Sequence, residues 1–437
     1  MKAGWRLAFA CAVALAAAPV QAAIELQFWH SMTGVLADQV TTIAAKFNSS
    51  QREYRVVPVY KGDYDQGIAA GIAAFRAGNA PHILQVYEVG TASMMAAKGA
   101  VKPVYELMTE AGEPFDPAAF LPPVASYYTD SKGKMLSLPF NASTTVLYYN
   151  KDLLRRAGLD PKRPPRTWQE LEAAAAKLKA GGVGCAYTSA WQSWVHLENF
   201  SARHNLPFAT RSNGFEGADA RFVFNGPVQV RHLAKLAEWQ KKGYFAHSSR
   251  KREAQERFFD GTCAMLTSSS AAYGNVLKLA KFDFGVAPLP YDADVTGAPK
   301  NTIIGGASLW VFAGKSREEN HGVAKFFRFL SQPEIQAEWH RTTGYLPITK
   351  AAYQLAKKQG LYERQPGLDV AVQEMMGETP TVHARGLRVG NFVQIRAVID
   401  EELDAVWSGR KTPRQALDSA KARGDVLLKE FEQAHHP

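Results

Sequence analysis

An alternation of strand and helix patterns over the first 90 residues is the feature that most constrains the fold of this chain. Residues 24–29, 54–60 and 83–87 have the character of short strands, and the segments between them carry apolar residues at helical spacing. Strands that alternate with helices predict a parallel, helix-covered sheet, in which ligands bind beyond the carboxyl ends of the strands. Tyr64 follows the second strand and Glu88 the third, so both are expected to face one crevice, unless they serve only as residues at helix starts.

Residues 139–152 change character partway along. Residues 139–143 form an irregular stretch with polar side chains that can hydrogen-bond a ligand or their own backbone. Residues 144–149 are a β-branched and aromatic run that favours a strand. The residues alone leave open whether this segment is a surface loop before a strand or part of a binding site.

The first 22 residues have the three parts of a secretory signal peptide. A short basic start is followed by an apolar run over residues 7–20, and small residues at Val20 and Ala22 predict cleavage after Ala22. The run is short for a membrane span, and no later stretch approaches about 18 uninterrupted apolar residues. A soluble exported protein is therefore predicted.

The charge of the chain is moderately positive, with 51 Lys and Arg residues against 41 Asp and Glu residues. The basic residues are scattered apart from short runs such as residues 250–252, so the positive field is mild and favours anionic small molecules. The chain has no basic stripe interleaved with aromatic residues, which argues against a nucleic-acid partner.

Two cysteines, Cys185 and Cys263, remain after the predicted cleavage. In an oxidising compartment they form either a disulfide or two free buried thiols, and both interpretations stay open. The length of the chain predicts two or more domains. Because no long linker separates them, the chain is expected to cross between lobes several times.

Three later segments combine turns with side chains that suit a ligand. Trp191 and Trp194 share one face of a helical turn after a strand, and they either pack in the core or form a flat wall for the carbon chain of a ligand. Residues 267–275 open a helix with several hydroxyl groups, which is either a serine N-cap or an anion site. Gly305 and Gly306 interrupt a β run, a pattern that marks close approach by a ligand or another backbone.

Arg396 occupies a core position in a predicted helix. Residues 392–406 place apolar side chains on one helical stripe, and Arg396 lies on that stripe. A buried guanidinium needs an anionic partner. The partner is either structural, such as Asp400 or Glu401 nearby, or an anionic ligand, for which the planar arginine fork is suited.

The chain resembles the extracytoplasmic solute-binding proteins of ABC importers, and among them those that bind sn-glycerol 3-phosphate. Residues 139–152 are similar to the first crossover between the two lobes in this family, where a Pro-Phe-x-x-Ser/Thr segment carries a ligand-binding hydroxyl and a Tyr-Tyr-Asn-Lys-Asp strand end follows. The similarity covers essentially the whole mature chain. Its other segments are residues 28–32, 59–62, 83–90, 303–310 and 344–350.

The resemblance implies a two-lobed α/β fold of the type II, maltose-binding-protein-like class. Each lobe would be a helix-flanked, mostly parallel sheet, and three interlobe crossovers would lie near residues 138–144, 300–306 and 343–347. The implied division is residues 23–140 with 303–344 for lobe 1, and residues 141–302 with 345–437 for lobe 2.

The resemblance also implies a set of ligand-binding residues: Tyr64, Glu88, Ser143, Ser269, Gly306, Tyr345 and Arg396, with Trp191 and Trp194 as an aromatic wall. The hydroxyl and guanidinium donors of this set suit a phosphate, and the backbone amide of Gly306 has no side chain in its way. The carboxylate of Glu88 accepts hydrogen bonds and therefore suits glycerol hydroxyls. Because three serines adjoin, Ser268 or Ser270 could take the place of Ser269.

The implied function is that of a periplasmic solute-binding component, which captures sn-glycerol 3-phosphate and glycerophosphodiesters such as glycerophosphocholine. It would deliver them to permease subunits that work with a cytoplasmic ATPase. A monomer without catalytic activity, metal or cofactor is expected. The alternatives are a sugar-binding protein of the same superfamily, against which the buried arginine argues, and an exported glycerophosphodiester hydrolase, for which the chain lacks His-Glu-x-x-His and Gly-x-Ser-x-Gly motifs.

Overall fold

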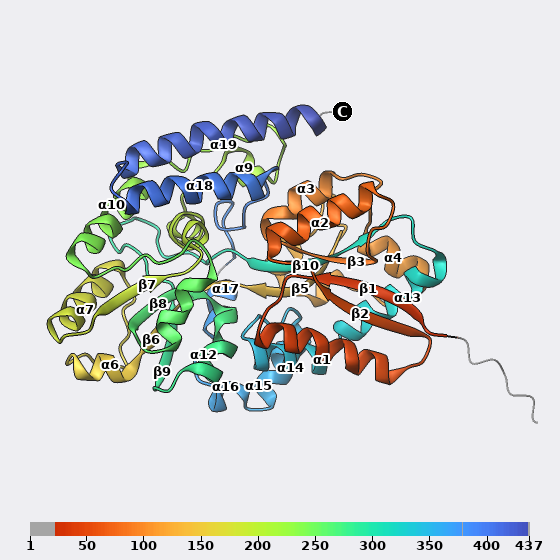
Figure 1. Cartoon of the computed structure of the whole chain (residues 1–437), viewed down its shortest axis with the longest axis horizontal. Helices are drawn as coiled ribbons and strands as arrows, with labels where there is room; N and C mark the ends of the chain where they lie inside the picture. Colours follow the sequence, from red (N-terminus) through yellow and green to blue (C-terminus); the bar gives the residue numbers. More distant parts are fainter. Residues whose placement is uncertain (1–21, 378, 436–437) are drawn as a thin grey trace, which may run out of the picture.

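The computed structural model describes residues 22–377 and 379–435, so the predicted signal peptide lies outside them apart from Ala22. The described chain forms two lobes side by side, each with a β-sheet flanked by helices (Figure 1). The prediction of a two-lobed α/β protein is confirmed. No helix in these ranges is long and apolar enough to cross a membrane.

The sheet of the first lobe has six strands, in the order β2–β1–β3–β10–β4 with β5 also paired to β10. Its strands are β1 (Ile24–His30), β2 (Tyr54–Tyr60), β3 (Ile83–Tyr87), β4 (Val101–Lys102), β5 (Leu138–Ser143) and β10 (Gly305–Phe312). One face is covered by α1 (Val35–Ser50), α13 (Arg317–Leu330) and α14 (Pro333–Thr343), and the other by α2 (Tyr64–Arg76) and α3 (Thr91–Ala96) (Figure 1). The three strands predicted within the first 90 residues are confirmed.

The sheet of the second lobe has four strands in the order β7–β8–β6–β9. These are β6 (Thr145–Asn150), β7 (Cys185–Ser189), β8 (Cys263–Ser269) and β9 (Phe284–Pro288). One face is covered by α7 (Trp168–Ala180), α10 (Pro227–Lys242) and α18 (Phe392–Trp407), with α19 (Pro413–His435) packed on α18, and the other by α12 (Tyr273–Leu279) and α17 (Val370–Met376) (Figure 1). A disulfide joins Cys185 to Cys263 across β7 and β8, which decides between the two interpretations of these cysteines.

Shorter helices complete the two lobes. They are α4 (Val104–Ala111), α5 (Pro122–Tyr127), α6 (Lys151–Arg156), α8 (Phe200–Arg203), α9 (Thr210–Gly214), α11 (Glu256–Phe259), α15 (Lys350–Lys358) and α16 (Leu361–Arg364).

Both sheets are mixed, so the prediction that each is mostly parallel is wrong. β1 pairs in parallel with β2 and β3, and β7 with β8, but β10 runs antiparallel to β3, β4 and β5. β6 likewise runs antiparallel to β8 and β9. The antiparallel strands β5, β6 and β10 adjoin the crossovers between the lobes, and they are not joined through the strand–helix–strand units that produce parallel pairs.

The crossover segments lie side by side at the junction of the lobes. A single residue, Thr144, separates β5 of the first sheet from β6 of the second. Ala142 of β5 pairs with Gly306 of β10, and the carbonyl of Ala142 accepts a hydrogen bond of 2.7 Å from the backbone N–H of Leu346. The three segments predicted as crossovers are therefore in contact, whereas the lobe boundaries given above stay predictions.

Two buried apolar clusters lie on opposite faces of the sheets, and each has members in both lobes. Successive side chains of a strand point to opposite faces, so β10 contributes Trp310 to one cluster and Leu309 and Val311 to the other. The two apolar layers therefore continue across the junction of the lobes. Polar side chains at the strand ends remain to form the site between them.

Candidate functional site

A cavity of about 100 Å³ lies between the two lobes, and all of the residues implied by the resemblance line it. Other lining residues were not suggested by the sequence, among them Ser31, Met32, Tyr87, Arg252, Gln255 and Asn275. A second cavity of about 180 Å³ adjoins the first and shares Tyr64, Tyr87, Trp191, Trp194, Arg252 and Arg396 with it. The structure thus brings the predicted set together, while contact of each residue with a ligand stays a prediction.

The ends of strands and helices position these side chains. Glu88 follows β3 directly, and Tyr64 is the first residue of α2, which follows β2. Both face the same cavity, as the alternation of strands and helices predicted. Ser143 ends β5, and because β10 is antiparallel to β5, Gly306 at the start of β10 lies beside that end.

Tyr64 and Tyr345 present neutral hydroxyl groups to the cavity. Burial raises the pKa of each phenol above its usual value. Tyr64 stacks on Tyr87 with ring centroids 4.8 Å apart, and its hydroxyl accepts a hydrogen bond of 3.1 Å from the Asn141 amide. The ring of Tyr345 stacks on Trp339 at 5.8 Å. Each phenol keeps its proton. The Tyr345 hydroxyl donates a hydrogen bond to Met32 Sδ at 3.8 Å, a weak acceptor that a ligand oxygen can replace.

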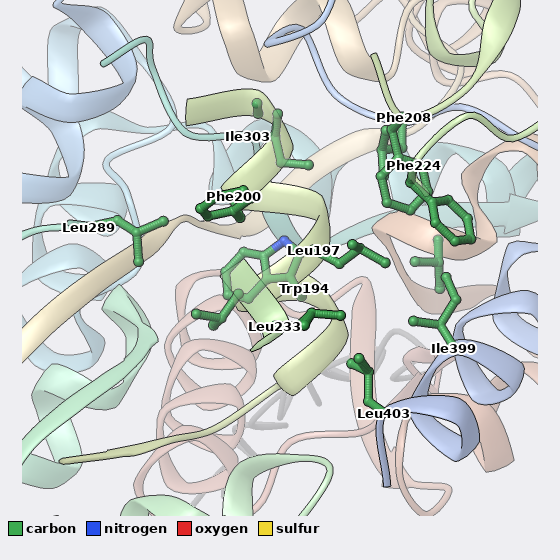
Figure 2. Packing of buried hydrophobic residues seen from close by; sticks show 14 of the residues in the cluster. Trp194, Leu197, Phe200, Phe208, Phe224, Leu233, Leu289, Ile303, Ile399 and Leu403 are labelled. Atoms are coloured by element: carbon green, nitrogen blue, oxygen red, sulfur yellow. The ribbon is translucent and has the colours of Figure 1, made fainter. Parts of the chain in front are cut away.

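Trp194 both packs in the core and lines the cavity. Its side chain is buried in the apolar cluster between the helices of the second lobe (Figure 2). It begins a π-helical turn, η3 (Trp194–Asn199), a feature that is frequent at functional sites. The indole ring occupies the space that a Cβ atom of Gly305 would need, which explains the first of the paired glycines.

Trp191 lies at the boundary between the two cavities in a strained backbone conformation. Its φ of 56° is rare for a bulky residue. The backbone N–H of Trp191 donates to the carbonyl of Lys251 at 3.2 Å, and that of Gln192 donates to the carbonyl of Arg250, also at 3.2 Å. The loop that carries the basic run at residues 250–252 therefore holds this tryptophan in place. Strain of this kind clusters at ligand sites.

The backbone conformation at position 306 requires glycine. Its φ of 86° lies in the left-handed region, which glycine adopts without steric cost. A Cβ atom at this position would also overlap the carbonyl oxygen of Asn141. The second of the paired glycines therefore presents bare backbone to the cavity.

Among the three adjoining serines, Ser269 is the one that lines the cavity. The hydroxyl of Ser268 instead accepts a hydrogen bond of 2.7 Å from the side chain of Gln255. Ser269 Oγ also accepts from the backbone N–H of Ala271 at 3.2 Å and so caps the short turn that follows β8. A capping serine still has its own O–H to donate, so the N-cap and the anion-site interpretations are compatible here.

Arg396 is buried between two carboxylates from different elements. Its Nε and Nη2 atoms donate to Glu198 at 2.8 and 2.6 Å, and its Nη1 atom lies 2.8 Å from Glu88 Oε1. Glu198 belongs to the second lobe and Glu88 to the first. We call Glu88, Glu198 and Arg396 the buried triad.

The suggestion that Asp400 or Glu401 is the structural partner of Arg396 is wrong. Asp400 accepts a hydrogen bond from the Ser193 hydroxyl, and Glu401 pairs with Arg423 of α19. The physical reason is that the stripe carrying Arg396 packs against η3 and against the short turn η1 (Glu88–Gly90). Its guanidinium therefore meets side chains of those turns and not those of its own helix.

Charges in the buried triad are set by burial and by mutual attraction. Burial raises the pKa of the Glu88 carboxyl, and the positive charge of Arg396 opposes this rise. Burial disfavours the charged guanidinium, but the carboxylates of Glu198 and Glu88 outweigh it and hold the pKa of Arg396 well above its usual value. Arg396 therefore remains charged while three of its five N–H donors are taken by carboxylates.

Glu198 is the member of the buried triad that the sequence did not suggest. It is 2% exposed, and 198 positions separate it from Arg396 along the chain. The only local signal was its place four residues after Trp194, on the same face of one turn. Arg252 was noted only as part of a basic run, although it lines both cavities.

Comparisons with known proteins agree with this geometry. Residues 42–368 match the protein family described as bacterial extracellular solute-binding protein. The sn-glycerol-3-phosphate-binding periplasmic protein UgpB of Yersinia pseudotuberculosis is 56% identical over 419 residues, 96% of this chain and 95% of that protein. UgpB of Escherichia coli O1:K1 is 56% identical over 418 residues, 95% of each chain.

Solved structures share the fold at lower identity. UgpB from Mycobacterium tuberculosis in complex with glycerophosphocholine has a TM-score of 0.78 at 21% identity, covering 93% of this chain and 99% of that one. Maltose-bound MalE3 of Thermotoga maritima has a TM-score of 0.77 at 20% identity, covering 93% and 100%. The predicted maltose-binding-protein-like fold is thus confirmed. Given the family match and these relatives, the chain belongs to the family of bacterial extracellular solute-binding proteins.

Proposed function

We propose that this protein is the periplasmic component of an ABC importer that captures sn-glycerol 3-phosphate between its lobes and delivers it to the membrane permease and its ATPase. The observation that carries the proposal is the polarity of the cavity, which is lined by neutral hydroxyl donors, a bare glycine backbone and one carboxylate. The names of the relatives at 56% identity support the same ligand. Binding without turnover is proposed, since those relatives are named as binding proteins.

The phosphate would lie among the hydroxyl groups. Ser143, Ser269 and Tyr345 each have an O–H to donate, and Gly306 adds a backbone N–H. Arg396 retains two N–H groups beyond those bonded to the carboxylates, and these can donate to ligand oxygens that lie near Glu88.

The glycerol part would lie toward Glu88. An ionised carboxylate only accepts hydrogen bonds, which suits ligand hydroxyls and repels a phosphate. Trp191 and Trp194 offer flat apolar surfaces for the carbon chain of the ligand. A glycerophosphodiester such as glycerophosphocholine would place its head group past Trp191, where the second cavity provides space.

Calorimetric titration of the purified mature protein with glycerol 3-phosphate, glycerophosphocholine and maltose tests this function. Ser269→Ala is expected to weaken glycerol 3-phosphate binding about tenfold, because it removes one hydrogen bond to a charged group. Ser270→Ala is the matched control, since Ser270 lines neither cavity and its buried hydroxyl has no hydrogen-bond partner within residues 22–377 and 379–435. Binding of maltose with no response to either phosphate ligand would replace the proposal by a sugar-binding function.

A further inference from the structure

We infer that Arg252 supplies the net positive charge that binds the ligand phosphate, and that Arg396 serves mainly to position Glu88. This inference rests on the proposed function and deepens it, because it names the residue that selects an anionic ligand. Arg252 opens the short turn η4 (Arg252–Gln255) of the second lobe and lines both cavities.

The first argument is the charge around the main cavity. Its charged lining residues are Glu88, Arg252 and Arg396. Arg396 is bonded to two carboxylates, those of Glu88 and Glu198, so the buried triad as a unit carries one negative charge when both acids are ionised. A phosphate that approached the triad alone would meet repulsion, since like charges in a site of low dielectric repel strongly.

The second argument is that Arg252 has no such compensation. In the described part of the chain no carboxylate lies within 4.0 Å of its guanidinium, and its Nη1 atom donates to the hydroxyl of Thr33 at 2.6 Å. Its neighbours differ: Arg250 pairs with Asp404, and Lys251 pairs with Asp63 and Asp65. Of three consecutive basic residues, Arg252 alone keeps its charge free for an anion.

The third argument is that Arg252 lines the main cavity together with Tyr64 and Tyr345, of which Tyr345 is proposed to bind the phosphate. Burial raises the pKa of Tyr64 and of Tyr345, and the positive charge of Arg252 opposes the rise at both. The guanidinium is thus close enough to influence both phenols. Its planar fork matches two phosphate oxygens, whereas a hydroxyl offers a single bond.

The position of Arg252 also connects the phosphate with closure of the lobes. Arg252 belongs to the second lobe, and Thr33, its partner, follows β1 of the first lobe. We call Thr33, Asp63, Asp65, Lys251 and Arg252 the rim. A phosphate held by Arg252 would be bound at the rim, where side chains of the two lobes meet.

The test compares variants of the mature protein by calorimetric titration with glycerol 3-phosphate at two salt concentrations. Arg252→Gln is expected to weaken binding by about 10- to 100-fold, since it removes a charge-assisted contact to a doubly charged group. The dependence of the Kd on salt should also become shallower than in the unmodified protein. Arg252→Lys keeps the charge and should restore part of the affinity.

Two controls separate this role from others. Arg250→Gln removes the same charge two residues away and should change the Kd by less than about twofold, because Arg250 is already paired with Asp404. Thr33→Val removes the interlobe hydrogen bond while leaving the charge of Arg252, and its loss of affinity should be clearly smaller than that of Arg252→Gln.

The outcomes distinguish the two proposals. If the unmodified protein does not bind glycerol 3-phosphate, the proposed function fails and this inference fails with it. If the unmodified protein binds but Arg252→Gln binds equally well, the inference alone is overturned. It is also overturned if Thr33→Val reproduces the loss seen in Arg252→Gln, because Arg252 would then act only through its hydrogen bond between the lobes.

Discussion

The buried triad and the rim both connect the two lobes through a cation and carboxylates, but in very different surroundings. The side chains of Arg396 and Glu198 are 11% and 1% exposed, whereas those of Lys251 and Asp65 are 37% and 39% exposed. A buried pair that loses one partner leaves an uncompensated charge in a low dielectric, while an exposed pair that loses one partner is rehydrated. Ion pairs in the buried triad should therefore determine the stability and geometry of the site. Ion pairs at the rim should affect mainly the rate of ligand release.

The comparison is tested most strongly by removing Glu198. Glu198→Ala leaves the buried Nε and Nη2 donors of Arg396 without acceptors, and unfolding is expected to require about 3 to 5 kcal/mol less free energy. Ligand affinity should fall with it, because Glu88 and Arg396 lose their orientation. Chemical denaturation and calorimetric titration measure the two effects. Glu401→Ala, which breaks an exposed pair with Arg423, is the matched control and should change stability by less than about 1 kcal/mol.

Removal of the disulfide should lower the stability of the protein without changing the geometry of the site. Replacing Cys185 and Cys263 together by alanine is expected to cost about 2 to 4 kcal/mol of stability. Cys263 begins β8 and Ser269 ends it, about 20 Å apart at strand spacing, so the ligand Kd should stay within about twofold. A large loss of affinity in this variant would show that the site depends on global stability, and would weaken the contrast between triad and rim.

A fall in pH should lower stability through the buried histidine that bonds the Tyr345 backbone, and not through the Asp63–Lys251 pair at the rim. Burial lowers the pKa of His340 to about 4, and its hydrogen bond to the Tyr345 carbonyl only partly opposes this. Since the unfolded histidine titrates near 6.5, its neutral folded form contributes stability above that pH, which is lost as the pH falls towards 4. At pH 5 the loss is roughly 2 kcal/mol.

Denaturation of the protein at pH 7 and pH 5 checks this expectation. His340→Gln should reduce the difference by roughly 2 kcal/mol, while His30, His196 and His204, whose pKa values burial also lowers, keep their contributions. At the rim, burial of Asp63 is outweighed by hydrogen bonds from the Gln66 backbone and Lys251, which hold the pKa of Asp63 below its usual value. The pair of Asp63 and Lys251 therefore stays charged over this range. An equally steep loss of stability in His340→Gln would assign the acid sensitivity to other groups.

The smallest effect is expected from breaking the rim pairs. Lys251 Nζ lies 3.0 Å from Asp63 and 2.7 Å from Asp65, yet all three side chains are more than a third exposed. Lys251→Met should therefore lower stability by about 1 kcal/mol or less, and its main effect should be faster ligand release at low salt. Stopped-flow dissociation measures this rate. A loss of stability as large as that of Glu198→Ala would contradict the proposed contrast.

Much of the fold could be predicted from short-range patterns. The strands at residues 24–29, 54–60 and 83–87 correspond to β1, β2 and β3, and the convergence of Tyr64 and Glu88 followed from their places after two of these strands. The mixed sheets could not be predicted in this way, because period and composition describe a strand but not the direction of its partner. β10 pairs with β3 and β5, which lie far from it in the chain.

For the site, the sequence by itself determined that Arg396 lies on a buried helical stripe and must meet an anion, since helical spacing decides which side chains share a face. Only the tertiary structure decided that the anions are Glu88 and Glu198 and that Cys185 lies beside Cys263. It also decided that Arg252 is the basic residue of its run without a carboxylate partner among the residues that the structure describes. The physical reason is the separation along the chain between the residues that interact. Spacing along one element sets the direction of a side chain, whereas its partner depends on how distant segments of the chain are packed together.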